Sequence, residues 1–92
     1  DMHDAFYNWG NALSDQAKQK SGAEADGLFE EAGKKYAEAV RIKRDMHDAF
    51  FNWGAALLVQ AKQKSGAEAG RLLEKAAEKL RRGTDLHPTQ AE

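Results

Sequence analysis

Apolar residues recur along the chain at intervals of three and four positions, the spacing that places them on one face of an α-helix. The first such face comprises Met2, Ala5, Phe6, Trp9, Ala12, Leu13 and Ala17, and the second Ala25, Leu28, Phe29, Ala32, Tyr36, Ala39 and Val40. No segment shows the alternation of apolar and polar residues that is typical of strands. The pattern predicts an all-α fold with four antiparallel helices near residues 2–20, 24–43, 46–64 and 68–86.

The same sequence is written twice along the chain. Residues 1–6 return as residues 45–50, and residues 16–25 return unchanged as residues 60–69, so the offset is 44 residues. A fixed period of this length is the signature of helical repeats. We therefore expect two repeats, 1–44 and 45–88, followed by a short tail, 89–92.

Local signals predict where the helices begin and end. Asp1 and its copy Asp45 are suited to N-caps of the first and third helices. Two interpretations remain open for the end of the first helix. Gly22 could adopt the left-handed conformation that ends it, or Ser21 could cap the second helix in a capping box with Glu24.

Several positions match a known repeat family. The first unit contains Phe6-x2-Trp9-Gly10-x2-Leu13, then Ala32-x3-Tyr36 and Ala39, whereas the second contains Phe50-x2-Trp53-Gly54-x2-Leu57, then Ala76-x3-Leu80 and Pro88. This spacing resembles the tetratricopeptide repeat, and the resemblance covers nearly the whole chain. It implies an α-solenoid of helical hairpins, here with longer helices, because the usual repeat has about 34 residues.

The resemblance also assigns structural roles. Glycines at 10 and 54 would let a neighbouring helix approach closely, as would Ala32 and Ala76 from the second helix of each unit. Large side chains would fill the space between the antiparallel helices at the density of a protein interior. Trp9, Phe29 and Tyr36 are expected to be such residues, and Trp53 is likewise expected in the core.

The junction between the units lacks one family feature. The proline that ends the second unit, Pro88, is Arg44 in the first unit. A normal turn at Lys43, Arg44 and Asp45 is the favoured interpretation, since Asp45 is suited to an N-cap. Because arginine does not break a helix, these residues could instead be a hinge through which a fused helix swaps between two chains.

The two first helices differ in one consistent way. Polar or amphipathic residues of the first unit become apolar in the second at four positions that share a helix face: Tyr7 to Phe51, Asn11 to Ala55, Ser14 to Leu58 and Asp15 to Val59. In the family this face lines the concave groove. The resemblance therefore implies a groove that binds a peptide or helix, lined by Tyr7, Asn11, Phe51, Asn52, Ala55, Leu58 and Val59.

Two functions are compatible with this surface. The first is a non-catalytic protein–protein interaction scaffold that binds its ligand in the groove. The alternative is a structural self-assembly unit, in which the apolar stripe of the third helix forms a homodimer seam. Some tetratricopeptide modules clamp a carboxylate with basic residues, but here Tyr7 stands where the first lysine should be, so we do not expect such a clamp.

The composition narrows the range of functions and binding sites to be considered. The net charge is −1, and there are no cysteines, which excludes disulfides and cysteine-based zinc sites. His3 and His47 are interpreted as surface residues in first helical turns, and lysines at helix ends as solvated charges rather than a nucleic-acid site. We expect no enzyme activity, no cofactor and no metal.

The length of the apolar runs bears on location. The longest run, residues 55–59, is far shorter than the roughly 20 residues that span a bilayer. No signal-like segment opens the chain, which looks like part of a longer or engineered protein. A protein or peptide partner, no membrane partner and a soluble, cytoplasmic location are expected.

Overall fold

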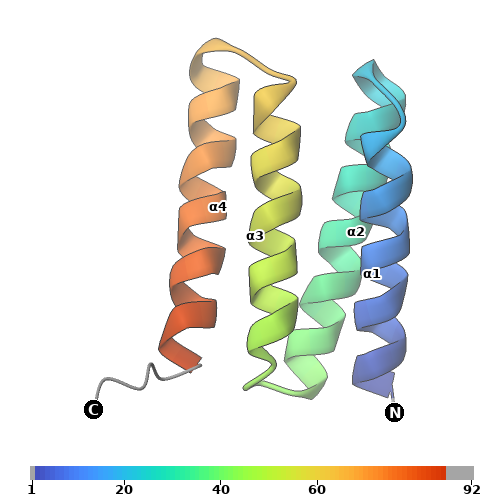
Figure 1. Ribbon diagram of the computed structural model, residues 1–92, viewed down its shortest axis with the longest axis vertical. Coiled ribbons are helices and arrows are strands. Elements are labelled where there is room, and N and C mark those ends of the chain that lie inside the picture. The colour runs from blue at the N-terminus through green and yellow to red at the C-terminus, as the bar shows by residue number, and fades with distance from the viewer. Residues whose placement is uncertain (1, 87–92) are drawn as a thin grey trace.

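Four helices in two antiparallel hairpins make up the computed structural model, which describes residues 2–86. They are α1 (Met2–Lys18), α2 (Gly22–Ile42), α3 (His47–Lys62) and α4 (Gly66–Leu86). The hairpins α1–α2 and α3–α4 stand side by side, with α1 and α4 at opposite edges (Figure 1). The expected all-α architecture of helical hairpin repeats is confirmed. No helix within residues 2–86 is long and apolar enough to cross a membrane.

Equivalent glycines begin the second helix of each hairpin. Gly22 and Gly66 have φ angles of +65° and +63°, a left-handed conformation that costs glycine little because it has no Cβ. Ser21 precedes α2 with an extended backbone, but its side chain makes no capping hydrogen bond. Gly22 thus has the predicted left-handed conformation, but it begins α2 and does not end α1, which stops at Lys18. The capping-box hydrogen bond from Ser21 is absent.

A turn separates the two hairpins. After α2 ends at Ile42, the N–H of Lys43 donates to the carbonyl of Ala39, and the N–H of Met46 donates to that of Lys43. The Lys43 ammonium binds the Asp45 carboxylate at 2.9 Å and lowers the pKa of that carboxyl below its ordinary value. Because the chain folds back here, α2 and α3 are not one continuous helix.

The predicted N-cap at Asp45 is wrong. Met46 occupies the position before α3, and no side chain caps this end of the helix. The Asp45 carboxylate lies too early in the chain and is bound to Lys43. The equivalent prediction for Asp1 falls outside the described residues.

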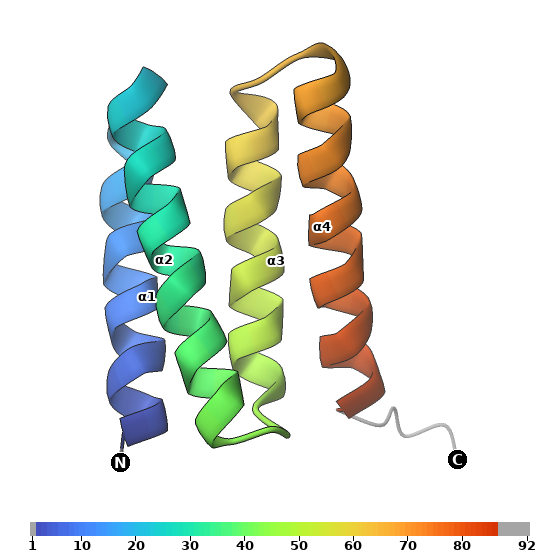
Figure 2. The same ribbon diagram turned by 180° about the vertical axis from the view of Figure 1, so that it is seen from behind.

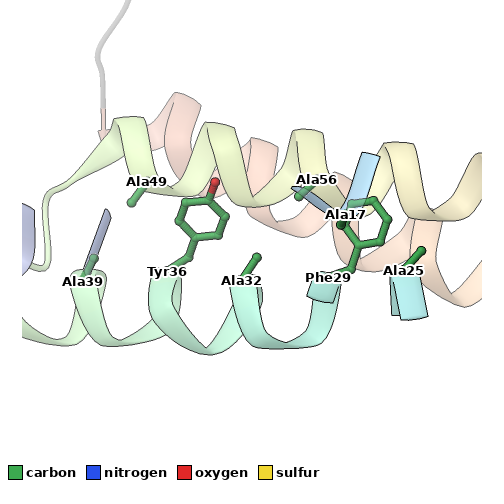
Figure 3. Packing of buried hydrophobic residues seen from close by; sticks show 8 residues of the cluster. All are labelled: Ala17, Ala25, Phe29, Ala32, Tyr36, Ala39, Ala49 and Ala56. Carbon is green, nitrogen blue, oxygen red and sulfur yellow. The ribbon is translucent and has the colours of Figure 1, made fainter. Parts of the chain in front are cut away.

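Small residues allow close packing within each hairpin. A Cβ on Gly10 would lie 2.9 Å from the Tyr36 ring, and one on Gly54 would lie 2.7 Å from the Leu80 side chain. The expected close approach at both glycines is confirmed. Figure 3 shows Tyr36 directed from α2 toward α3, among the buried residues Ala17, Ala25, Phe29, Ala32, Ala39, Ala49 and Ala56.

The predicted burial of large residues is right for α2 and wrong for Trp9. Tyr36 and Phe29 are buried, whereas half of the Trp9 surface is exposed. Trp9 stacks on Phe6 with ring centroids 6.2 Å apart, and the Lys35 ammonium lies 3.9 Å from its ring. Its copy Trp53 is half-buried because α2 covers it near Gly33. No earlier helix among residues 2–86 covers Trp9.

An ion pair fixes one hairpin on the other. The Asp26 carboxylate of α2 accepts a hydrogen bond from the Gln60 amide of α3 at 3.1 Å, and it also binds the Lys64 ammonium just after α3. These interactions, the one with Lys64 foremost, lower the pKa of Asp26. The second unit has Gly70 in place of Asp26, so only the first unit can make this contact.

The pH dependence of stability should report this ion pair. Because the pKa of Asp26 is lower in the folded than in the unfolded chain, its ion pair stabilises the fold above the ordinary value of 3.8. That stabilisation is lost as the pH falls through the folded-state pKa. Asp26→Asn should therefore lower the free energy of unfolding at pH 7, and its difference from wild type should shrink as the pH falls below 3.8 and through the folded-state pKa. Urea denaturation followed by circular dichroism measures both values.

Lys64→Met supplies the matched control for this prediction. It removes the other partner, so it should reduce the same pH-dependent difference, and the double variant should lose little more than either single variant. An Asp26→Asn penalty of equal size at pH 7 and pH 2 would contradict the assignment.

Candidate partner-binding groove

A groove runs between the first helices of the two hairpins, α1 and α3. It has a volume of about 290 Å³ and is lined by Asn11, Ser14, Asp15, Lys18, Tyr36, Asn52, Ala55 and Ala56. Tyr36 belongs to α2, which packs against both α1 and α3, so its ring lies beneath the groove and its hydroxyl reaches the floor.

A chain of hydrogen bonds forms the floor of this groove. The Tyr36 hydroxyl donates to the Asn11 carbonyl oxygen at 2.6 Å. The Asn52 amide donates to the same oxygen and to the Tyr7 hydroxyl, each at 2.9 Å. Three helices are thereby joined through polar side chains, because α1 supplies Tyr7 and Asn11, α2 supplies Tyr36 and α3 supplies Asn52.

Burial keeps the Tyr36 phenol neutral. Loss of hydration on burial, followed by the nearby Tyr7, raises the pKa of Tyr36 well above its ordinary value of 10.0, although a hydrogen bond with Ser14 opposes the shift. Tyr36 therefore stays a hydrogen-bond donor at every pH at which the protein would function. Within residues 2–86 no buried side-chain nitrogen or oxygen lacks a hydrogen-bond partner, so the floor is internally satisfied.

The two walls of the groove differ in polarity. The α1 wall carries Asn11, Ser14 and Asp15, and Asp15 pairs with Lys18 at 3.7 Å. The α3 wall carries Asn52, the exposed Ala55 and the buried Ala56. The groove therefore presents an amide, a hydroxyl and an ion pair on the α1 side, and an amide and the Ala55 methyl group on the α3 side.

The structure brings together only part of the predicted binding surface. Tyr7, Asn11 and Asn52 meet in the hydrogen-bonded floor, and Ala55 lines the groove. Val59 instead packs against the core, and Leu58 is half-buried without lining the groove. The other lining residues, Ser14, Asp15, Lys18, Tyr36 and Ala56, were missed.

Phe51 departs furthest from its predicted place. Its ring lies 3.1 Å from where a Cβ on Gly83 of α4 would stand, and its centroid is 6.1 Å from that of His47. Phe51 thus packs within its own hairpin. Phe51 is therefore not available to the homodimer seam that the sequence suggested. The helix-swapped form of that dimer would need α2 and α3 to be continuous, but the turn at residues 43–46 separates them.

Sequence reasoning did contain one signal for Tyr36. It is the only buried aromatic residue of α2 with a hydroxyl group, and a buried tyrosine normally directs that hydroxyl to a polar partner. The stripe of α2 placed Tyr36 in the core, but the direction of its hydroxyl depends on where α1 and α3 lie.

Each histidine of the two first helices lies close to the carboxylate of the residue that follows it. His3 lies 3.4 Å from Asp4, and His47 lies 3.3 Å from Asp48. In the part of the chain that the structure describes, no three histidine, cysteine or acidic residues gather as a metal site would require.

A second cleft, of about 510 Å³, is lined by residues of α2, α3 and α4. These three helices follow one another in that order across the molecule (Figure 2). Its apolar lining includes Phe29, Trp53 and Leu72. Three lysines and two glutamates stand among its lining residues: Lys34, Lys75, Lys79, Glu30 and Glu78. This cleft is larger than the groove between α1 and α3, but its charged residues are mainly cationic.

Comparison with protein families decides the relationship of the chain. Residues 2–92 match the family model described as plant specific mitochondrial import receptor subunit TOM20. The chain belongs to the plant TOM20 family. Neither the curated proteins nor the solved structures gave a match. TOM20 is TPR-like, so the family fits the hairpin repeats, although the match is to TOM20 and not to a tetratricopeptide family model.

Membership of the TOM20 family corrects the expected location. The family is one of mitochondrial import receptors at the outer membrane, so the predicted cytoplasmic location is wrong. The expected absence of a membrane partner also conflicts with this finding. Composition and the length of apolar runs describe these helices and contain no information about the compartment of the cell in which the protein works. The expected role in protein–protein interaction agrees with a receptor family.

Proposed function

We propose that this chain is a non-catalytic receptor module that binds the targeting segments of proteins imported into mitochondria. The units 1–44 and 45–88 act as its two repeats, and the ligand lies in the groove between α1 and α3. The observation that carries the proposal is the match of residues 2–92 to a family of mitochondrial import receptors.

The groove suits the chemistry of such segments. Mitochondrial targeting segments are amphipathic, rich in arginine and poor in acidic residues. An amphipathic helix would set its apolar face on Ala55, with an arginine near the Asp15 carboxylate on the α1 wall. The floor uses the Asn11 carbonyl and the Asn52 amide nitrogen, which leaves the Asn11 amide and the Asn52 carbonyl for polar groups of the ligand.

Charge favours this groove over the larger cleft. The lysines of that cleft outnumber its glutamates, so an arginine-rich segment would meet repulsion there. In the groove between α1 and α3, Asp15 and Lys18 balance, and the other lining residues are uncharged.

Binding of a labelled targeting peptide tests the proposal. A fluorescent peptide that is amphipathic and arginine-rich should bind the full chain, as measured by fluorescence anisotropy. Ala55→Arg should weaken binding by about tenfold, or about 1.4 kcal/mol, because it fills the groove and repels the ligand. A scrambled peptide of the same composition, which lacks an apolar face, should bind much more weakly.

Ala77→Arg is the matched control, because Ala77 is exposed on α4 and lines neither the groove nor the second cleft. It adds the same charge and should leave affinity unchanged within about twofold. Equal losses for both variants would show that net charge alone governs binding, and the groove would then not be the binding site.

A further inference from the structure

The face of α3 that packs on α2 has an identical copy on α1. Six residues of α3 and of the turns on either side of it form what we call the α3 stripe: Met46, Ala49, Trp53, Ala56, Gln60 and Lys64. The α1 stripe, Met2, Ala5, Trp9, Ala12, Gln16 and Lys20, has the same residue at each of the six equivalent positions. The four apolar replacements in the third helix lie outside this stripe.

The α3 stripe is the surface of α3 on which α2 packs. Ala49 and Ala56 are 0% and 5% exposed, and the Trp53 indole nitrogen lies 3.3 Å from where a Cβ on Gly33 would stand. Two helical turns further along α3, Gln60 binds Asp26. Asp26 precedes Gly33 by the same two turns, so the two helices run antiparallel with an acid at one contact and a glycine at the other.

The α1 stripe is open in the described part of the chain. Met2 is 62% exposed and Trp9 is 50% exposed, and Ala5, Ala12 and Gln16 are also exposed at the edge of the molecule (Figure 1). The ring of Trp9 is already in place, because Lys35 lies over it just as Lys79 lies 4.1 Å from the ring of Trp53.

Charge completes the resemblance between the two stripes. Lys20 pairs with Glu24 at 3.7 Å, as Lys64 pairs with Glu68 at 3.9 Å. Lys64 also binds Asp26, whereas the acid that would correspond to Asp26 at Lys20 does not come from residues 2–86. The α1 stripe thus has the same apolar surface, amide and cation as the α3 stripe, on which α2 packs.

We propose that the α1 stripe binds an α-helix of a partner protein in the way that α3 binds α2. The partner helix lies antiparallel to α1, with an acidic residue opposite Gln16 and Lys20 and a glycine seven residues later opposite Trp9. This surface is separate from the groove between α1 and α3, so the proposal does not depend on what that groove binds.

A second copy of the chain is the poorer occupant. Its α2 is already held by its own α3, and its outer helix α4 has Gly70 and Ala77 where α2 has Asp26 and Gly33. A stacked copy would therefore leave Gln16 and Lys20 without a carboxylate. The stripe therefore fits a helix of another sequence, one that carries both the acidic residue and the glycine.

Because α2 packs on the α3 stripe, a peptide with the sequence of α2 can serve as the probe for the α1 stripe. A labelled peptide of residues 22–44 should bind the full chain, as measured by fluorescence anisotropy. Lys20→Glu should weaken binding by about tenfold, and a peptide carrying Asp26→Lys should restore it, because the charges are then exchanged. Lys75→Glu, the same charge change on α4, should leave affinity within about twofold of wild type. Binding that is insensitive to Lys20→Glu would overturn the proposal.

A fusion protein tests the same contact without relying on the isolated peptide, which can be too weakly helical in water to bind. Residues 22–44 can be joined directly before residue 1, since residues 1–6 repeat residues 45–50 and the junction is then a native one. In a Trp53→Phe background, acrylamide quenching of Trp9 should fall severalfold relative to the unfused chain. In the matched control fusion, the added copy of residues 22–44 carries Asp26→Lys and Gly33→Leu and the original copy is unchanged. Trp9 should then be as accessible to acrylamide as it is in the unfused chain. Equal quenching in both fusions would overturn the proposal, and peptide binding by the groove would be unaffected.

Discussion

Tyr36→Ala should cost about 3–5 kcal/mol of the free energy of unfolding, because it empties the centre of the first hairpin. The Tyr36 side chain is 1% exposed, and its ring fills the space beside Gly10. Its removal also takes away the donor to the Asn11 carbonyl. A domain of this size has a total stability of only about 5–15 kcal/mol, so much of the protein would unfold at moderate urea concentrations. Urea denaturation followed by circular dichroism measures the loss.

Two further variants separate the causes of this loss. Tyr36→Phe keeps the ring and removes the hydroxyl, and should cost about 1 kcal/mol, the typical net value of one hydrogen bond. Trp9→Ala removes a larger side chain that is half exposed, and should still cost less than Tyr36→Ala. If Trp9→Ala proved the more damaging, Tyr36 would not be the centre of the core.

Gly54→Ala should destabilise the second hairpin by about 1–3 kcal/mol, although alanine is the better helix former. The new methyl group would lie 2.7 Å from Leu80 and 3.2 Å from the carbonyl oxygen of Ala76. The leucine side chain can move, but the backbone of α4 must shift as well. Thermal unfolding followed by circular dichroism should show a lower midpoint.

Gly70→Ala makes the same chemical change on α4 of that hairpin with the opposite expected sign. Apart from its chain neighbours and the adjacent backbone of α4, no atom lies within 4 Å of a Cβ at Gly70, so only the helix preference remains, and stability should rise by about 0.5–1 kcal/mol. If both substitutions stabilised the protein, the close contact between Gly54 and Leu80 would be excluded.

The groove could be predicted only in part. The sequence placed Tyr7, Asn11 and Asn52 on facing helices, and they meet because one repeat offset brings α1 and α3 side by side. Phe51 was wrongly placed because the rotation of α3 depends on α4, where Gly83 leaves room for an aromatic ring. No local pattern records which of two adjacent faces a neighbouring helix will cover.

The sequence by itself determined the helices and the 44-residue period, because those depend on residues close along the chain. The resemblance of its repeats also implied the close helix approach at Gly10 and Gly54. Only the tertiary structure decided which copy of an identical surface is covered. Trp9 and Trp53 lie in the same local sequence and each has a lysine of its own hairpin over its ring, but α2 also covers Trp53 near Gly33, whereas no described helix covers the equivalent side of Trp9. Whether a side chain is buried depends on which helix packs next to it as well as on its own residue type. The order of the repeats along the chain decides which helix that is.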